Sequence, residues 1–136
     1  MMSTAVLFSF LIVIVYVSNV QGCSCMEQTD QQRFCNPAFV IKGKVTGITY
    51  VGDNVKYEVE NLYSFRFKEN SKLIVQSSKD FAMCGMRLEK GKVYLISGYK
   101  NQYGAYETSN CSWNQLWTDI PKQTRTALEK GTYAQC

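Results

Sequence analysis

Six cysteines constrain this chain more than any other feature of its sequence. Cys23 and Cys25 form a Cys-x-Cys motif near the start, and nine residues separate Cys25 from Cys35, whereas the other three cysteines lie far downstream. Six cysteines behind a secretory leader are typical of three disulfides formed in an oxidising compartment. Any bond between the two groups ties the N-terminal segment to the body of the fold, although the residues alone leave the pairing open.

The first 22 residues have the features of a signal peptide. Residues 5–17 form an uncharged apolar block, which is short for a membrane span and typical of the hydrophobic core of a signal peptide. Gly22, with Val20 two positions before it, suits signal peptidase, although no Lys or Arg precedes the block. We therefore expect residues 1–22 to be removed and the protein to be secreted, free of the membrane. An uncleaved anchor is the alternative.

Composition excludes several function classes. The chain has no His, which removes His general bases, His-based triads and the commonest zinc ligand. Glu58 and Glu60 alternate along a predicted strand, where a solvent-facing side is the expected role. The net charge of +4 is spread out, so nucleic acid is not an expected partner. Cys-x-Cys also differs from the Cys-x-x-Cys of redox enzymes. We expect a protein that is not an enzyme and has no cofactor or metal of its own.

Apolar and polar residues alternate in a way that predicts a mainly β domain. Gly52-Asp53-Asn54 predicts a hairpin turn between the first two strands, and Gly43 and Gly47 predict a bulge or strong coiling in the first. No βαβ spacing is present, so we expect an antiparallel sheet closed into a small barrel. The five predicted strands are residues 38–51, 55–67, 73–75, 92–98 and 103–108.

Three short helices are expected around the sheet. Residues 28–34 predict a helix or turn that ends before Pro37. Trp113 and Trp117 fall at helical spacing with Ser112 placed to cap, and residues 121–131 predict a further helix that opens with proline and ends at glycine. A small barrel needs its open end covered, so we expect both tryptophans to be core residues rather than a ligand cage.

Over residues 23–136 the chain resembles the N-terminal, netrin-like domain of tissue inhibitors of metalloproteinases. The N-terminal Cys-x-Cys and the spacing of all six cysteines carry most of the similarity. Because the sequence ends at Cys136, we expect one netrin-like domain, a single-domain form of the family. The other matching stretches are Arg33-Phe34-Cys35-Asn36, Val40-Ile41-Lys42, Ala82-Met83-Cys84-Gly85, Tyr94-Leu95-Ile96-Ser97-Gly98 and Asn110-Cys111-Ser112.

The resemblance implies an OB-like, five-stranded closed barrel with flanking short helices. It also implies the disulfide pairs Cys23–Cys84, Cys25–Cys111 and Cys35–Cys136. Each bond would close a loop of roughly 60 to 100 residues, for which the chain-entropy model gives about 4 to 5 kcal/mol as an upper guide. The disulfides are therefore expected to dominate stability.

The resemblance further implies that the N-terminus inhibits zinc metalloproteinases. The free α-amine and the carbonyl oxygen of Cys23 would chelate the protease's catalytic zinc and displace the attacking water, with the side chain of Ser24 in the specificity pocket. Zinc metalloproteinases are thus the expected partners of a monomeric inhibitor, and extracellular matrix components stay open as others. The residues expected to contact the protease are Ser24, Cys25, Met26, Glu27, Ala82, Met83, Cys84 and Gly85.

Two departures from the family pattern define the alternative. Met26-Glu27 stands where vertebrate members usually have a small or apolar residue and then proline, and Asp30 stands where many have a second proline. The turn after Gly52 is also short, so we expect no long protruding hairpin. The alternative is a non-inhibitory, secreted netrin-like module that binds other proteins, a role that needs no free terminal cysteine.

The first testable prediction is that the secreted protein begins at Cys23. Cleavage after Gly22 leaves the α-amine of Cys23 free, which chelation requires. Intact mass and N-terminal sequencing of the secreted protein measure this directly. A mature chain that begins at any other residue would remove the chelation hypothesis.

Overall fold

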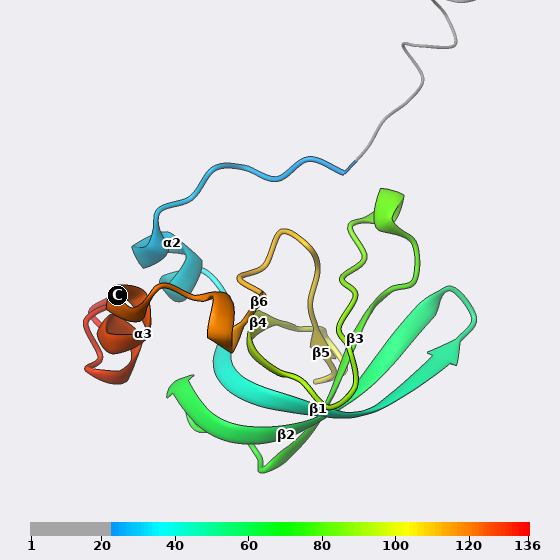
Figure 1. The fold of residues 1–136 in the computed structure, drawn as a ribbon. Helices are drawn as coiled ribbons and strands as arrows, with labels where there is room; N and C mark the ends of the chain where they lie inside the picture. The colour runs from blue at the N-terminus through cyan, green and yellow to red at the C-terminus, as the bar shows by residue number, and fades with distance from the viewer. Residues whose placement is uncertain (1–22) are drawn as a thin grey trace, which may run out of the picture.

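The computed structural model describes residues 23–136, and the predicted signal peptide lies outside the described residues. Strands β1, β2, β3, β5 and β4 pair in that order and β4 pairs back onto β1, so five strands form a closed ring, with β6 attached to β4 (Figure 1). The predicted mainly β fold with five strands in a closed arrangement is confirmed. The strands are β1 (Phe39–Val51), β2 (Asn54–Arg66), β3 (Lys72–Ser78), β4 (Val93–Lys100), β5 (Tyr106–Glu107) and β6 (Gln115–Leu116).

One pairing in the ring is parallel, which corrects the expectation of an antiparallel sheet. β3 and β5 run in the same direction, with Val75 opposite Tyr106, whereas the other pairs are antiparallel. β5 is also shorter than predicted. The side-chain Oδ1 of Asn101 accepts the N–H groups of Tyr103 at 2.8 Å and Ala105 at 3.0 Å, which holds the start of the predicted fifth strand in a turn.

The β1–β2 hairpin joins two strands of 13 residues by a short turn, and β2 follows its hydrophobic pattern. Val55, Tyr57 and Val59 are each buried in the core, while Glu58 and Glu60 between and after them are exposed. Successive side chains of a strand point to opposite faces, so this alternation fixes which face of β2 lines the interior. The solvent-facing role predicted for the two glutamates is confirmed.

Glycines bend this hairpin where the sequence predicts. Val51 pairs with Asn54, so Gly52 and Asp53 form a two-residue turn, and Gly52 has a φ of 58°. The register of β1 against β2 shifts between Lys42 and Gly43 and again just before Gly47. These irregularities increase the coiling of the strand and let β1 pair with β2 on one side and β4 on the other.

Two apolar clusters form the core. The first fills the ring; the second lies between β1, β4 and the helices. The first contains Phe39, Ile41, Val45, Val55, Tyr57, Val59, Leu73, Val75, Leu88, Tyr94 and Ile96. The second contains Phe34, Val40, Leu95, Trp113, Trp117, Ile120 and Leu128.

Two short α-helices flank the ring. α2 (Asp30–Cys35) starts with a capping box, in which Thr29 Oγ1 accepts the N–H of Gln32 at 3.2 Å and the Gln32 side chain accepts the N–H of Thr29 at 3.0 Å. α3 (Lys122–Glu129) follows the predicted proline and ends before Gly131, whose φ is 72°. Both helices are confirmed. Within residues 23–136 no helix is long and apolar enough to cross a membrane.

The helix predicted around Ser112 and Trp113 is wrong. Strand β6 and a 3₁₀ turn, η2 (Trp117–Asp119), occupy this region instead. The N–H of Trp113 donates to Ser97 Oγ at 2.7 Å, and the side chain of Asn114 donates to two oxygens just upstream at 2.7 and 2.8 Å. These tertiary hydrogen bonds hold the chain extended beside β4 and override the helical spacing.

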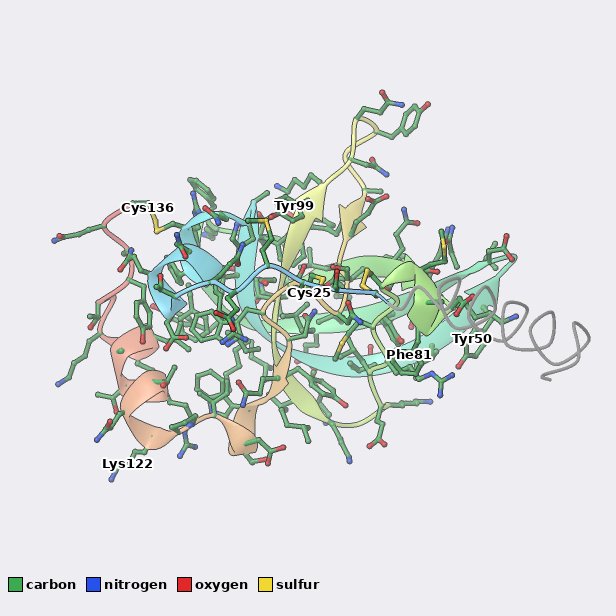
Figure 2. The ribbon with its side chains drawn as sticks, turned by 90° about the horizontal axis from the view of Figure 1, so that it is seen from above. Cys25, Tyr50, Phe81, Tyr99, Lys122 and Cys136 are labelled. Atoms are coloured by element: carbon green, nitrogen blue, oxygen red, sulfur yellow. A yellow bond between two sulfur atoms is a disulfide. The ribbon has the colours of Figure 1, made fainter. Side chains whose placement is uncertain are left out.

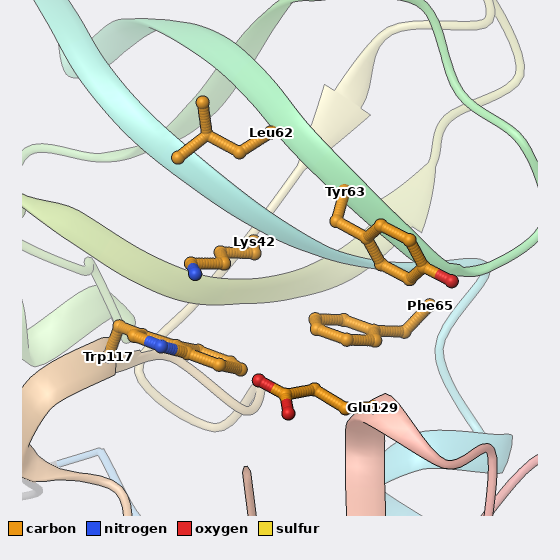
Figure 3. Close-up of a pocket in the computed structure, with 6 residues that line it drawn as sticks. All are labelled: Lys42, Leu62, Tyr63, Phe65, Trp117 and Glu129. Carbon is orange, nitrogen blue, oxygen red and sulfur yellow. The ribbon is translucent and has the colours of Figure 1, made fainter. Parts of the chain in front are cut away.

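Trp117 is a core residue, as expected. It is 9% exposed, and Lys42 Nζ lies 4.4 Å from the centroid of its ring while Phe65 stacks on it at 5.8 Å (Figure 3). A groove of about 340 Å³ remains between these side chains, Leu62, Tyr63 and Glu129. The lysine stem and the phenylalanine ring pack on the indole, so the expectation that this tryptophan is not part of an open cage holds.

A buried carboxylate joins the β2–β3 loop to the strands that close the ring. Glu69 has a side chain only 4% exposed; it accepts the hydroxyl of Tyr106 at 2.6 Å and pairs with Lys100 Nζ at 3.1 Å. Burial raises the pKa of Tyr106 to about 12, and the hydrogen bond and charge of Glu69 add to the effect. The tyrosine therefore stays a hydrogen-bond donor at physiological pH.

The second prediction concerns Gly98 at the ring closure. This buried residue of β4 lies opposite Phe39, and a Cβ here would collide with the carbonyl oxygen of Glu107. We expect Gly98→Ala to lower the free energy of unfolding by about 1–3 kcal/mol, as overpacking does in cores. Denaturant unfolding with the disulfides intact measures it.

Gly47→Ala is the matched control. It is also a strand glycine, but a Cβ there meets only the flexible carboxylate side chain of Glu58. We expect a much smaller change in unfolding midpoint. Equal losses in the two variants would show that the close approach at Gly98 does not govern the closure.

Candidate functional site

The N-terminal strip, residues 23–28, crosses the surface without helix or strand before it enters α2 (Figure 1). Ser24 through Gln28 are exposed, and Met26 is 88% exposed. Two disulfides hold the strip, Cys23–Cys84 and Cys25–Cys111, each with Cα atoms 5.3 Å apart. The strip is therefore fixed at two points while its remaining side chains face solvent.

The parallel pairing of β3 and β5 brings the two anchor points together. Parallel strands end at the same edge of a sheet, so the segments that follow them leave side by side. The first carries Cys84 and the second carries Cys111, and the N–H of Asn110 donates to the carbonyl of Cys84 at 2.9 Å. The ring thus places both disulfide partners under the strip.

A tight turn after β3 presents Cys84. It contains a 3₁₀ segment, η1 (Phe81–Met83), and the Oδ1 of Asp80 accepts the N–H of Ala82 at 2.9 Å. The carbonyl of Asp80 accepts the N–H groups of Met83 at 3.1 Å and Gly85 at 3.0 Å. Asp80 therefore organises the turn from its first residue.

The end of this turn needs unusual backbone geometry. Cys84 has a φ of 59°, in the left-handed region of backbone conformation that residues other than glycine rarely adopt. Gly85 is buried, and a Cβ there would collide with the carbonyl oxygens of Ser78 and Asp80. Gly85 thus permits the turn but presents no surface, whereas Met83 is 71% exposed beside Cys84.

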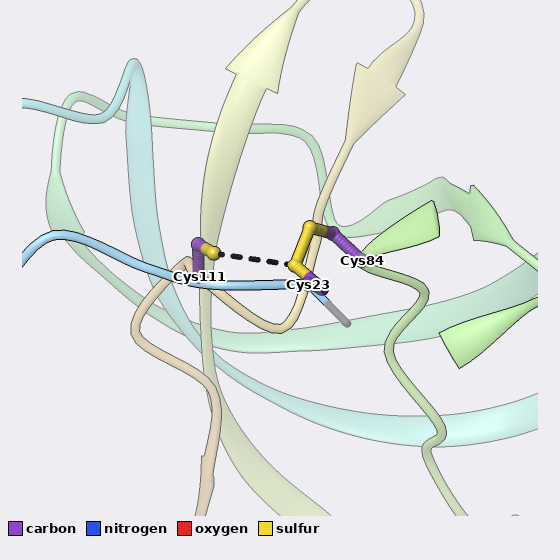
Figure 4. Close-up of side chains that lie close together, drawn as sticks. All are labelled: Cys23, Cys84 and Cys111. Atoms are coloured by element: carbon purple, nitrogen blue, oxygen red, sulfur yellow. Dashed lines mark hydrogen bonds between the residues drawn. A yellow bond between two sulfur atoms is a disulfide. The ribbon is translucent and has the colours of Figure 1, made fainter. Parts of the chain in front are cut away.

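The two anchoring disulfides are in contact with each other. The Sγ atoms of Cys23 and Cys111 lie 3.9 Å apart (Figure 4). The Oδ1 of Asn110 lies 3.3 Å from the Sγ of Cys23, 3.5 Å from that of Cys111 and 3.7 Å from that of Cys25. Strip, turn and Asn110 therefore form one packed unit.

Three of these sulfur atoms have the spacing of a metal cluster. The Sγ atoms of Cys23, Cys84 and Cys111 all lie within 4.8 Å of one another. Each belongs to a disulfide, so none is a thiolate, the form of cysteine that binds metals. In their disulfide-bonded state these three sulfur atoms provide no thiolate ligand for a metal.

The structure brings together most of the residues expected at the site. Cys23 to Glu27 lie on the strip, and Ala82 to Cys84 lie on the turn to which it is bonded, with Cys35–Cys136 joining α2 to the C-terminus. The three disulfide pairs are those that the resemblance implies.

Comparison with known proteins identifies the family. Residues 21–136 match the family described as tissue inhibitor of metalloproteinase. The chain belongs to this family. The resemblance seen in the sequence is therefore confirmed over the whole of the described region.

Relatives of this family member differ in length. An NTR domain-containing protein of Margaritifera margaritifera is 29% identical over 131 residues, covering 90% of this chain and 88% of the relative. Metalloproteinase inhibitor 4 of Mus musculus is 27% identical over 85% of this chain and 58% of its own length. Metalloproteinase inhibitor 2 of Homo sapiens is 27% identical over 79% of this chain and 54% of its own length. The chain thus spans little more than half of these vertebrate relatives.

Sequence reasoning missed three residues that shape the site in this family member. Asp80 caps the turn, Asn110 packs on both disulfides, and Arg87 places its guanidinium 4.4 Å from the ring centroid of the half-exposed Phe81. An aspartate two residues before Ala82 is a local signal for such a turn. The roles of Asn110 and Arg87 depend on tertiary contacts and have no such signal.

Proposed function

We propose that this chain is a secreted inhibitor of zinc metalloproteinases that binds the target's catalytic zinc through the α-amine and carbonyl oxygen of Cys23. Membership of the family, and relatives named metalloproteinase inhibitors, support inhibition rather than catalysis. The observation that carries the proposal is the strip itself. Its first residue is locked by a disulfide while the residues after it are exposed.

The chemistry requires a neutral amine. An unperturbed α-amino group has a pKa of about 7.7–8.0, so near neutral pH most of it is protonated and has no lone pair for zinc. Binding to the metal releases that proton. The amine nitrogen and carbonyl oxygen of Cys23 then form a five-membered chelate ring at the position where the protease holds its attacking water, and hydrolysis stops.

The two disulfides contribute by rigidity. A free N-terminal tail would lose conformational entropy when it enters the protease cleft, whereas a strip bonded at Cys23 and Cys25 has lost it already. Ser24 between them is exposed, which supports its entry into the specificity pocket. Met26 and Glu27 on the strip, and Ala82 and Met83 on the turn, are exposed beside it and form the proposed contact surface.

The alternative is a secreted module that binds other proteins without inhibiting a protease. One observation favours it. Met26 and Glu27 are exposed at the positions where vertebrate members usually have a small or apolar residue and then a stiffening proline. The strip therefore lacks that proline and has a carboxylate near the proposed zinc-binding end. Inhibition assays on the native protein separate the two.

The third prediction tests the amine. One alanine added before Cys23, or acetylation of its amine, moves or removes the lone pair but leaves all three disulfides in place. We expect inhibition to fall by at least about 100-fold, a loss of roughly 3 kcal/mol, with circular dichroism and the thermal transition nearly unchanged. Inhibition constants against a panel of zinc metalloproteinases measure it.

An alanine added after Cys136 is the control. This end of the chain lies beside α2 and α3 (Figure 1), and the extension should leave inhibition intact. If the N-terminally extended protein inhibits as well as the native one, chelation by Cys23 is wrong. If the native protein inhibits no member of a broad panel, the binding-module alternative is the better account.

The fourth prediction concerns specificity. Ser24 is exposed and takes no part in the core, so Ser24→Gly and Ser24→Arg should fold normally. Because only the group in the pocket changes, we expect the ranking of inhibited proteases to change, by about tenfold or more for individual enzymes. Unchanged affinity for every responsive protease in both variants would show that residue 24 stays outside the pocket.

A further inference from the structure

The contact between the two anchoring disulfides places a third sulfur beside each bond that holds the N-terminus. Cys111 Sγ is 3.9 Å from Cys23 Sγ, and the Sγ atoms of Cys23, Cys84 and Cys111 all lie within 4.8 Å of one another (Figure 4). The third disulfide, Cys35–Cys136, joins α2 to the C-terminus, well apart from Cys25 in Figure 2. It therefore serves as an internal reference for reactivity.

The disulfide with the most accessible sulfurs is the one that can start an exchange. Cys25 and Cys111 are both exposed, whereas Cys23 and Cys84 are half-buried. Attack on a disulfide needs access to one of its sulfur atoms, and exposed disulfides are the labile ones. An external thiol thus meets Cys25–Cys111 before Cys23–Cys84.

We propose that Cys25–Cys111 is a thiol-exchange site, and that its opening transfers Cys23 from Cys84 to Cys111. In the first step an external thiolate bonds to the sulfur of Cys25, and Cys111 leaves as a thiolate. In the second, that thiolate bonds to the sulfur of Cys23, and Cys84 leaves. In the third, Cys84 bonds to Cys25 and releases the external thiol. These three exchange steps together need no net oxidant or reductant.

The second step requires one rotation. In disulfide exchange the attacking sulfur approaches along the line of the bond that breaks. With Cys111 Sγ at its observed 3.9 Å from Cys23 Sγ, such an approach would place Cys111 Sγ about 6 Å from Cys84 Sγ. The observed limit of 4.8 Å shows that the resting geometry is not in line. Breaking the bond to Cys25 frees the side chain of Cys111 to rotate, so the intact bond itself prevents the exchange.

One contact favours the transfer once the first bond opens. The hydrogen bond from the N–H of Asn110 to the carbonyl of Cys84 keeps the two segments adjacent without any disulfide. Cys111 therefore stays close to Cys84 and its partner Cys23 after it has left Cys25.

The transfer moves the N-terminal residue away from the η1 turn. Cys23 would be bonded to the segment that follows β5 instead of the turn that follows β3. The strip and the turn would then no longer form one contact surface, and inhibition would fall. This consequence alone rests on the proposed function. The exchange itself does not depend on the protein being an inhibitor.

The fifth prediction uses Cys25→Ser, which leaves Cys111 a thiol from the start. We expect the purified variant to contain the Cys23–Cys111 bond and a free Cys84, found by alkylation in acid-quenched samples and peptide mapping without reduction. Cys35→Ser is the matched control, since it frees Cys136 far from the other sulfurs. We expect roughly tenfold less free Cys84 in the control. An intact Cys23–Cys84 bond beside a free Cys111 would overturn the proposal.

The wild-type protein provides a test that requires no variant to fold. Incubation with reduced glutathione should produce the Cys23–Cys111 peptide. Cys136 is also exposed, but it lies away from the other two disulfides, so Cys35 and Cys136 should form no new pair with the other four cysteines. Reduction of Cys25–Cys111 without that peptide, or equal exchange of all three bonds, would overturn the proposal. Because peptide mapping reads the bonds directly, a protein that inhibits no protease still answers the question, and the two proposals fail separately.

Discussion

The pair of adjoining disulfides between the N-terminal strip and the sheet is the constraint on which the functional end of this protein depends. Terminal residues are usually disordered because they bury too little surface to offset the entropy of ordering them. Cys23 and Cys25 overcome this with two covalent bonds two residues apart, to partners 61 and 86 positions away. Residues 24–28 are exposed, so burial contributes little to their order. The strip is therefore held mainly by its covalent bonds.

The ring of strands matters because it positions the partners of those bonds. The short parallel pair β3–β5 sends the chain toward Cys84 and Cys111 from the same edge of the sheet. Asp80 and Gly85 then shape the turn that presents Cys84, one by hydrogen bonds and the other by the space it leaves. The buried Glu69 holds β4 and β5 to the loop before β3. The geometry of the N-terminal strip thus depends on residues of the ring and of the turn that presents Cys84.

The same arrangement has two consequences for function. Rigidity and exposure suit a segment that enters a protease cleft, because little entropy remains to be lost on binding. They also leave Cys25 and Cys111 open to external thiols, with the sulfur of Cys23 in contact. The stability of the fold and the resistance of the N-terminal strip to thiols are therefore separate properties. The distant Cys35–Cys136 bond and the two apolar clusters stabilise the fold, whereas Cys23–Cys84 and Cys25–Cys111 hold the strip.

The sequence by itself determined the elements whose signals are local. The alternation in residues 55–59 fixes the buried face of β2, the Thr29–Gln32 capping box fixes the start of α2, and the cysteine pattern indicates the family and its disulfides. Only the tertiary structure decided the rest. The helical spacing around Trp113 is overridden by the hydrogen bond that its N–H donates to Ser97 and by those that Asn114 donates. The two-residue strand β5 is too short for its sequence to indicate whether it pairs parallel or antiparallel. Such features depend on groups distant in sequence, whose contacts outweigh weak local preferences and are formed only when the ring closes.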